Sequence, residues 1–250
     1  MSSDDGHFGE RVAAAYDRSQ PELFADAAVL PVVDFLARLA GDGSALELGI
    51  GTGRIALPLA ERGVRVHGIE LSRAMLARLR AKPGGAELPV TIGDFSSARA
   101  GEGFAVVYLV FNTIMNLTSQ AEQVACFRNA ALQLRPGGVF VVEVMLPELQ
   151  RLAPGERARV IHAGAQRWSY DEYDIAAQRL VSHHFHEASG GRIERSSIPF
   201  RYVWPGELDL MAELAGMRLR ERWADWRREP FTSASRAHVS VWEKASDAGA

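Results

Sequence analysis

Residues 45–54 read Ala-Leu-Glu-Leu-Gly-Ile-Gly-Thr-Gly-Arg and connect a predicted strand to a predicted helix through a glycine-rich turn. Gly49, Gly51 and Gly53 have no Cβ atom, so the backbone of this turn can approach a ligand closely. The helix that follows begins with unpaired backbone N–H groups, which commonly contact bound ligands. The segment therefore predicts a cofactor-binding loop at the end of a strand.

The charges of this loop distinguish between two cofactors. The dinucleotide fingerprint G-x-G-x-x-G would have its third glycine at position 54, where this chain has Arg54. Glu47, two residues before the first glycine, would repel a pyrophosphate, whereas a carboxylate can pair with the ammonium group of S-adenosylmethionine (SAM). The loop therefore favours SAM over NAD.

The sequence around the loop alternates between strand and helix signals. Strands are expected at 44–48, 64–69, 88–92, 104–110 and 139–145, and helices at 52–62, 72–81 and 119–134. Such alternation predicts an α/β fold, in which a Rossmann-like sheet is covered by helices on both faces.

Two flanking segments depart from this alternation. Residues 1–40 are expected to form an N-terminal helical region. Residues 151–204 contain alternating polar and apolar runs, typical of a small antiparallel β insertion after the fifth strand. We therefore expect a SAM-binding core at 41–150 and 205–245, with 151–204 as a lid or substrate subdomain.

Two groups of residues in the insertion have competing interpretations. One strand face is expected to carry Ile198, Phe200, Tyr202 and Trp204. This face would pack in the core, contact a second subunit or form the wall of a substrate pocket. The second group consists of His183, His184, His186 and Glu187. No further ligands have metal-like spacing, so these histidines are expected to be solvated or to face the lid, and no metal is predicted.

Acidic residues follow the next two strands of the predicted sheet. Glu70 ends the second strand and could accept both ribose hydroxyls of an adenosine, although an acid at a helix start capped by Ser72 is a rival explanation when Glu70 is considered alone. Asp94 follows the third strand and could accept the adenine amino group beside Phe95, although an aspartate that forms a turn is an alternative. Ligands of open α/β sheets bind at these carboxyl ends, so the acids together predict a nucleoside site.

Four segments in the same order resemble the motifs of class I SAM-dependent methyltransferases. They are 47–53, 68–72, 93–94 and 134–140. The resemblance implies that Glu47 and the glycine loop hold the methionine part of SAM, Glu70 the ribose, and Asp94 with Phe95 the adenine. It also implies a cofactor-binding set of Tyr16, Glu47, Gly49, Gly51, Gly53, Arg54, Glu70, Leu71, Met75, Asp94, Phe95 and Phe111.

The flanks resemble a narrower branch, the small-molecule N-methyltransferases, which includes amino-sugar N,N-dimethyltransferases and the glycine N-methyltransferase type. The resemblance rests on the Tyr16-Asp17 pair before the core and on the insertion after strand five. In this branch the tyrosine lies near the sulfonium. Asn116 stands where amino-sugar enzymes carry a histidine. Tyr16 and Asn116 are the expected catalytic residues, with Asn116 orienting the nucleophile, because an amide is a poor base.

Composition excludes several other classes of protein. The 250 residues carry a formal net charge of -3 and no strongly basic stretch, which argues against a nucleic-acid partner. No apolar run approaches the roughly 18 residues that cross a bilayer, so no membrane partner is expected. The single cysteine, Cys126, excludes an intramolecular disulfide. No charged-then-apolar leader opens the chain, so a cytoplasmic location is expected.

The sequence therefore predicts an enzyme that transfers a methyl group from SAM to a small-molecule acceptor in secondary or small-metabolite metabolism. S-adenosylhomocysteine would be the product of the cofactor. N-methylation is favoured over O- or C-methylation, and a homodimer is compatible with the sequence. A non-catalytic SAM-binding protein is the alternative, followed by an NAD-dependent oxidoreductase.

Overall fold

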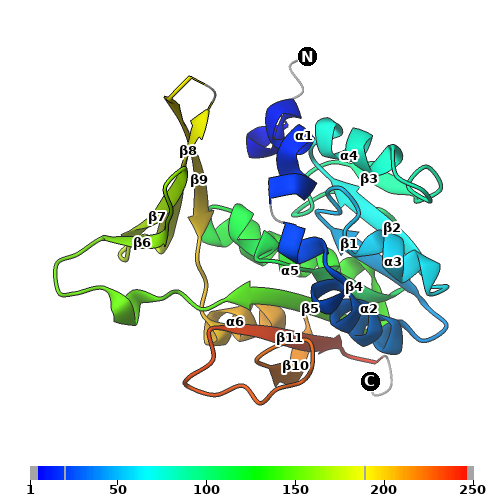
Figure 1. The fold of residues 1–250 in the computed structure, drawn as a ribbon. Helices are drawn as coiled ribbons and strands as arrows, with labels where there is room; N and C mark the ends of the chain where they lie inside the picture. Colours follow the sequence, from blue (N-terminus) through cyan, green and yellow to red (C-terminus); the bar gives the residue numbers. More distant parts are fainter. Residues whose placement is uncertain (1–4, 20, 189, 247–250) are drawn as a thin grey trace.

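The computed structural model describes residues 5–19, 21–188 and 190–246, which form two sheets and the helices around them. A seven-stranded sheet forms the body of the molecule, and a four-stranded antiparallel sheet stands beside it (Figure 1). The predicted Rossmann-like α/β fold with an antiparallel insertion is confirmed.

The large sheet has the order β10-β11-β5-β4-β1-β2-β3. Its strands are β1 (Ser44–Leu48), β2 (Arg65–Glu70), β3 (Val90–Ile92), β4 (Phe104–Leu109), β5 (Leu134–Met145), β10 (Met217–Trp223) and β11 (Ala237–Lys244). Strands β1 to β5 pair in parallel, and β11 pairs antiparallel with β5. The chain order reverses between β1 and β4, the position at which open α/β sheets bind ligands.

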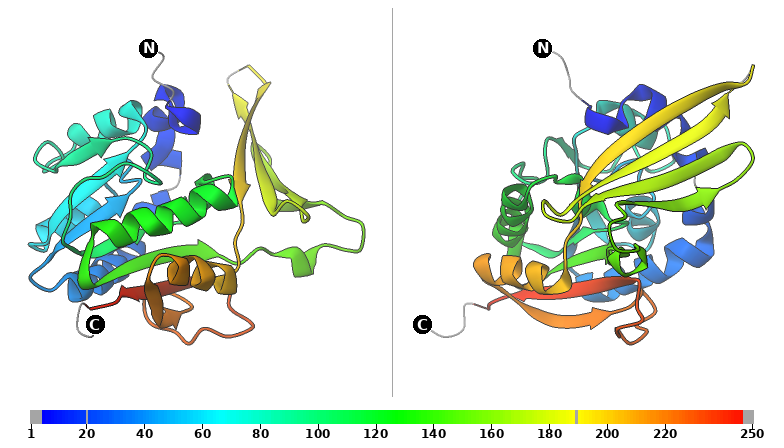
Figure 2. Two further views of the ribbon diagram at one scale, coloured as in Figure 1. Left: turned by 180° about the vertical axis from the view of Figure 1, so that it is seen from behind. Right: turned by 90° about the vertical axis from the view of Figure 1, so that its left-hand side faces the viewer.

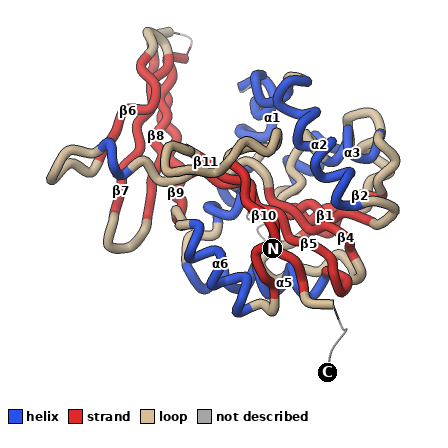
Figure 3. Tube along the Cα trace, turned by 90° about the horizontal axis from the view of Figure 1, so that it is seen from below, coloured by secondary structure: helices blue, strands red, loops and turns tan. Residues whose placement is uncertain are grey.

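Helices cover both faces of this sheet because its central strands are apolar on both sides. Leu46 and Val107 pack toward α5 (Gln120–Gln133) and α6 (Pro205–Leu214), whereas Ala45 and Val106 pack toward α2 (Asp26–Ala40) and α3 (Ala56–Glu61). Successive residues of a strand point to opposite faces, which gives this division. Figure 3 shows α5 and α6 on one side of the strands and α2 and α3 on the other.

The N-terminal segment lies across the carboxyl ends of the strands. It contains η1 (Gly6–Phe8), α1 (Glu10–Ser19) and η2 (Pro21–Phe24), and α1 packs against α4 (Arg73–Arg80). The Ser72 hydroxyl, which caps α4, also donates a hydrogen bond of 2.7 Å to the Phe8 carbonyl. The segment is thus fixed onto the body of the molecule.

The small sheet contains β6 (Ala158–Ala163), β7 (Arg167–Asp174), β8 (Arg179–Ala188) and β9 (Arg192–Arg201), in chain order. Arg201 ends β9 and connects the two sheets. The residue is 5% exposed, and its guanidinium donates hydrogen bonds to Gln178, Gln123 and Glu207. This buried network joins the small sheet to α5 and α6.

Three expectations from the sequence are wrong in detail. The helix expected at 52–62 begins only at Ala56, because the preceding residues continue the glycine loop. The fifth strand begins at Leu134 rather than 139, since Leu134 already pairs with Phe104 before a bulge. Tyr202 and Trp204 do not continue a strand face: β9 has ended, Tyr202 is buried in the core, and Trp204 is 39% exposed at the start of α6.

Candidate active site

The glycine loop makes a backbone turn that side chains would obstruct. Gly49, Gly51 and Gly53 have φ values of 71°, 56° and 81°, in the left-handed region. A Cβ atom on Gly49 would lie 2.9 Å from Thr113 Cγ2. On Gly51 it would lie 3.5 Å from Met75 Cε. The loop backbone therefore lies close to the segment after β4 and to α4.

Glu47 lies at the start of this loop and is 3% exposed. The Tyr108 hydroxyl of β4 donates a hydrogen bond of 3.0 Å to its Oε2 atom. Burial raises the pKa of the Glu47 carboxyl to about 8, outweighing this hydrogen bond and the charge of Arg54. A buried carboxylate in this position would be stabilised by a cation, such as the ammonium group of SAM.

Glu70 is held at the end of β2 by two backbone groups. The Gly51 N–H donates to its Oε2 atom at 2.7 Å, and the Ser72 N–H to its Oε1 atom at 2.8 Å. Burial raises the pKa of this carboxyl as well. Both interpretations of Glu70 therefore have structural support: it lies at a helix start next to the Ser72 cap, and it contacts the glycine loop. Each oxygen keeps a further lone pair for a ligand hydroxyl.

The residues expected around the adenine differ in exposure. Met75 is 3% exposed and lies beside Gly51, whereas Leu71 is 47% exposed. Phe95 lies next to Gly49, 3.8 Å from the position of an added Cβ. Asp94 is exposed and makes a turn, since its Oδ1 atom accepts the Ser96 N–H at 2.7 Å. The side chains thus lie along one side of the loop, from α4 to the end of β3.

Tyr16 extends from α1 toward the same loop. Its pKa is raised by burial first, and the charges of Arg54, Glu70 and Glu47 also act on its hydroxyl. Its ring centroid lies 6.3 Å from that of Phe8. The structure therefore brings Tyr16 together with the acids that end β1 and β2.

Asp17 fastens α1 to the glycine loop, a role that the sequence analysis did not assign. Its Oδ1 atom accepts a hydrogen bond of 2.7 Å from the Thr52 hydroxyl, and its Oδ2 atom lies 2.6 Å from Lys82 Nζ. Lys82 also donates to the Thr52 carbonyl at 2.7 Å. The only sequence signal was the position of Asp17 next to Tyr16.

The segment after β4 adopts a constrained backbone. Phe111 and Asn112 have φ values of 53° and 62°, which is uncommon for residues with side chains. Glu143 of β5 holds both: its Oε2 atom accepts the Phe111 N–H at 2.7 Å, and its carbonyl accepts the Asn112 N–H at 3.2 Å. The Arg54 guanidinium lies 5.5 Å from the centroid of the Phe111 ring. The hydrogen bonds to Glu143 and the contact with Arg54 thus hold this segment next to the glycine loop.

Asn116 lies farther along this segment, in η3 (Thr113–Asn116). It is half-buried, and its Nδ2 atom donates to the Thr113 carbonyl at 3.2 Å. The side-chain amide of Asn116 is therefore hydrogen-bonded within η3 itself. Asn116 is close in sequence to Phe111, but within the described residues its side chain forms no hydrogen bond with Tyr16 or Glu47.

The small sheet separates His183 from His184 and His186, because alternate residues of β8 project to opposite faces. His183 is 5% exposed and lies beside Tyr170, with 4.7 Å between ring centroids and an angle of 38° between the ring planes, whereas His184 forms a hydrogen bond of 3.1 Å with the Ser182 hydroxyl through Nε2. Within the described residues, no group of three or more His, Cys, Asp or Glu side chains is arranged to hold a metal ion. None of the described helices is long and apolar enough to cross a membrane.

A Rossmann-like sheet with a glycine loop and buried acids at the ends of β1 and β2 defines the SAM-dependent methyltransferase class. A family model described as a methyltransferase domain matches residues 45–138. The solved structure of the CcbJ methyltransferase from Streptomyces caelestis is 39% identical, covers 97% of this chain and 100% of its own, and superposes with a TM-score of 0.84.

Two curated relatives are named for methyl transfer to nitrogen. The cypemycin N-terminal methyltransferase of a Streptomyces species is 29% identical over 97% of this chain and 99% of its own. The dTDP-3-amino-3,6-dideoxy-alpha-D-glucopyranose N,N-dimethyltransferase of Streptomyces fradiae is 34% identical over 56% of each chain. The chain belongs to the SAM-dependent methyltransferases, which confirms the predicted enzyme class and cofactor.

Proposed function

We propose that this methyltransferase transfers the methyl group of SAM to an amine nitrogen of a small molecule in secondary or small-metabolite metabolism. The observation that carries the cofactor part is the buried Glu47 carboxyl: burial raises its pKa to about 8, and a bound cation would stabilise its ionised form. The choice of nitrogen is supported by relatives named for a peptide N-terminus and for an amino sugar.

The residues of this chain fit SAM at the carboxyl ends of β1 and β2. Glu47 would hold the ammonium group and Glu70 the ribose hydroxyls, while the glycine loop leaves room for the methionine part. The adenine would lie near Met75, Leu71, Asp94 and Phe95. Tyr16, Arg54 and Phe111 would complete the pocket from α1 and the segment after β4. Opposite charge at the ammonium and hydrogen-bond acceptors at the ribose give the site its selectivity for SAM.

SAM supplies an electrophilic methyl group on a sulfonium, and the transfer is an in-line displacement. The protein then has to align the nucleophile and exclude water. Tyr16, held over the loop through Asp17, would exclude water from the sulfonium side. Asn116 would orient the nucleophile through its amide. A neutral amine needs no base to attack, so an asparagine suffices at this position.

We also propose a division of labour along the chain. Residues 41–150 and 205–245 would bind SAM, while the N-terminal region 1–40 and the insertion 151–204 would cover the site and select the acceptor. The buried Arg201 network that joins the small sheet to α5 and α6 supports this division. The cytoplasmic location and the homodimer remain predictions.

The test measures methyl transfer with amines and their matched hydroxyl compounds. Purified protein and SAM are incubated with dTDP-3-amino-3,6-dideoxyglucose, with a short peptide that has a free N-terminus, and with versions in which a hydroxyl replaces the amine. We expect S-adenosylhomocysteine and a methylated product from an amine only. Transfer only to hydroxyl compounds would refute N-methylation, and SAM binding without any transfer would favour the non-catalytic alternative.

A further inference from the structure

Two consecutive residues after β4 adopt backbone conformations that residues with side chains rarely adopt. Phe111 and Asn112 both have positive φ values, and neither is a glycine. An asparagine tolerates the left-handed region, but a bulky phenylalanine is strained there. Such strain persists only where surrounding contacts outweigh it, and it is concentrated at functional sites. The contacts that hold Phe111 therefore point to a functional requirement.

These contacts come from the last residues of β5. The backbone pairing between β4 and β5 ends at Leu109. Beyond it, the Glu143 carboxylate accepts the Phe111 N–H at 2.7 Å, and the Asn112 Oδ1 atom accepts the Met145 N–H at 2.7 Å. Side chains thus continue the connection between the two strands after the backbone ladder has ended.

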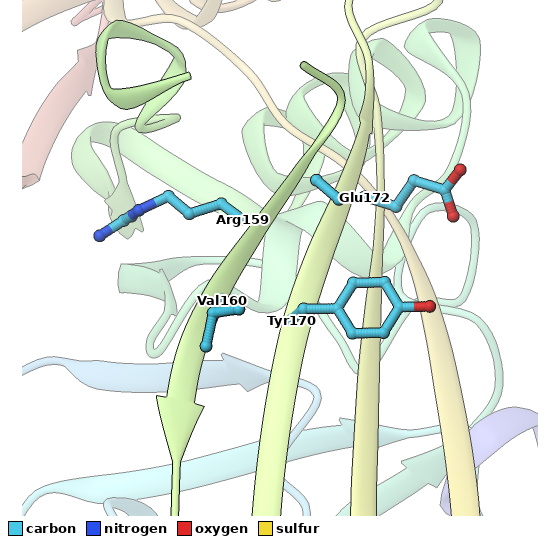
Figure 4. A pocket seen from close by; sticks show the side chains of 5 residues that line it. Arg159, Val160, Tyr170 and Glu172 are labelled. Atoms are coloured by element: carbon cyan, nitrogen blue, oxygen red, sulfur yellow. The ribbon is translucent and has the colours of Figure 1, made fainter. Parts of the chain in front are cut away.

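Glu143 differs from another strand glutamate in the nature of its partner. Glu172 of β7 lines a shallow hollow with Tyr170 and Arg159, and it lies 3.4 Å from the Nε2 atom of His183. Figure 4 shows Tyr170 and Glu172 extending in one direction and Arg159 in the opposite one. Glu143 forms no ion pair with any described residue, and a backbone N–H donates to its side chain. A half-buried carboxylate in an apolar strand needs a partner, and Phe111 supplies it.

The ring of Phe111 contacts a residue whose charge acts on the cofactor site. The Arg54 guanidinium lies 5.5 Å from the ring centroid and also donates to the Leu23 carbonyl at 3.3 Å. Burial raises the pKa of both Glu47 and Tyr16, and the positive charge of Arg54 opposes this shift in each. The backbone conformation of Phe111 therefore affects how Arg54 is held beside these two groups.

The rest of the segment after β4 is held independently of Glu143. Gln123 of α5 is fully buried, and its Nε2 atom donates to the carbonyls of Ile114 and Arg201 at 3.3 and 3.1 Å. Strand β5, which carries Glu143, points from the large sheet toward the small sheet in Figure 1 and in the view from behind in Figure 2. Loss of the Glu143 carboxylate should therefore release Phe111 while η3 stays in place.

We propose that Glu143 is a positioning residue for cofactor binding. Its carboxylate holds Phe111 in the left-handed conformation that places the ring against Arg54 and the glycine loop. Without this acceptor, Phe111 relaxes to a negative φ and its ring leaves Arg54. Glu143 thus acts through the Phe111 ring and not on SAM directly. The inference rests on the proposed place of Phe111 in the SAM pocket, and it is independent of the acceptor atom.

The test is a double-mutant cycle on SAM binding, measured by calorimetry without an acceptor. Glu143→Met removes the carboxylate at a similar volume, and we expect SAM to bind about tenfold more weakly, as for one lost hydrogen bond. Phe111→Ala should weaken binding by about tenfold as well. If Glu143 acts through the ring, the double variant should lose no more than about tenfold, whereas independent effects would multiply to about a hundredfold.

Conservative and control variants separate this role from a general loss of stability. Glu143→Gln keeps an acceptor oxygen and should bind SAM within about threefold of the wild type. Glu243→Met is the matched control and should leave SAM affinity unchanged. Glu243 is also a half-buried strand glutamate of the large sheet, but it lies opposite Val139 and pairs with Arg220 at 3.6 Å.

An NMR measurement reports the backbone conformation itself. The amide and α protons of one residue lie close together when φ is positive, so wild-type Phe111 should give a strong cross-peak between them. Glu143→Gln should keep this cross-peak and Glu143→Met should lose it. If Glu143→Met does not fold, Glu143→Asp replaces it, because its carboxylate is one methylene shorter and should also release Phe111.

Three results would overturn the proposal: a weak Phe111 cross-peak in the wild type, single losses that multiply in the double variant, or wild-type SAM affinity without the Glu143 carboxylate. The proposed N-methylation fails by a different observation, because SAM titration needs no acceptor. If amines receive no methyl group but the cycle is non-additive, the positioning role stands and N-methylation fails. If amines are methylated but SAM affinity does not depend on Glu143, N-methylation stands and the positioning role fails.

Discussion

The hydroxyl of Tyr108 donates a hydrogen bond of 3.0 Å to the Glu47 carboxylate, and both side chains are buried where β4 lies beside β1. Burial raises the pKa of both groups, and for Glu47 the value is about 8. The carboxyl of the cofactor-free protein is therefore mostly protonated at neutral pH. Binding of an ammonium group requires the ionised form, so cofactor binding and proton release are coupled.

This coupling predicts that SAM affinity depends on pH. Below a pKa of about 8, the folded protein must lose the Glu47 proton when SAM binds, so affinity should rise with pH. The limiting slope is about tenfold per pH unit for one proton, between about pH 5.5 and 7.5. Calorimetry in buffers of different ionisation enthalpy measures the released proton directly. Glu47→Gln should abolish the slope, and Asp94→Asn should keep it.

The same pKa shift predicts a stability change in the cofactor-free protein. The folded-state pKa lies above the ordinary value of 4.5, so the contribution of Glu47 is fully present below about pH 4.5 and is lost as pH rises through 8. Urea unfolding at a series of pH values should therefore show a wild-type loss between pH 5 and 8 that Glu47→Gln lacks. If the free energy of unfolding depended on pH in the same way in both proteins, the raised pKa would not belong to Glu47.

Loss of the Glu47 carboxyl should weaken cofactor binding directly. We expect Glu47→Ala to cost about 1.5–3 kcal/mol of SAM binding free energy, as for a hydrogen bond to a charged group. Glu47→Gln should recover only part, because the amide fills the space but carries no charge. Equilibrium titration with SAM gives both values. An unchanged dissociation constant in both variants would show that Glu47 does not contact the cofactor.

Asp17 should act as a positioning residue for α1. Its bonds to Thr52 and Lys82 hold this helix over the glycine loop, so Asp17→Asn should release the helix and weaken SAM binding by about 1 kcal/mol. Hydrogen exchange over residues 10–18 should become faster. Glu10→Gln is the control, because Glu10 pairs with Arg78 on the exposed side of α1. Equal effects of the two variants would refute a specific role for Asp17.

Asn116 and Tyr16 should influence methyl transfer more than cofactor affinity. If Asn116 orients the acceptor, Asn116→Ala lowers kcat by about tenfold, roughly the effect of one hydrogen bond, while the SAM dissociation constant stays within about twofold. Tyr16→Phe should likewise lower kcat while the SAM dissociation constant stays nearly unchanged. Steady-state kinetics with an amine substrate, together with SAM titration, separates the two effects. Loss of SAM binding in Asn116→Ala would contradict this division.

The positions of the glycine loop and of the acids at the strand ends were predictable because each group is local in sequence. The glycine loop and Glu47 lie within a single strand-to-helix connection, so their spacing already defines the turn and its charge. Glu70 and Asp94 each follow a strand, and parallel strands bring their ends to one edge of the sheet. Boundaries were predicted less well: the glycine loop delayed the start of α3, and pairing with Phe104 extended β5 back to Leu134.

The sequence by itself determined the α/β class, the glycine loop and the position of the acid two residues before it, because these depend on hydrophobic periodicity and on the spacing of neighbouring residues. Only the tertiary structure showed that Asp17 reaches Thr52, that Glu143 holds Phe111, and that Arg201 joins the small sheet to α5 and α6. These relationships join residues far apart in the chain. They depend on burial and strand register, which packing and sheet pairing decide, and which no local pattern specifies.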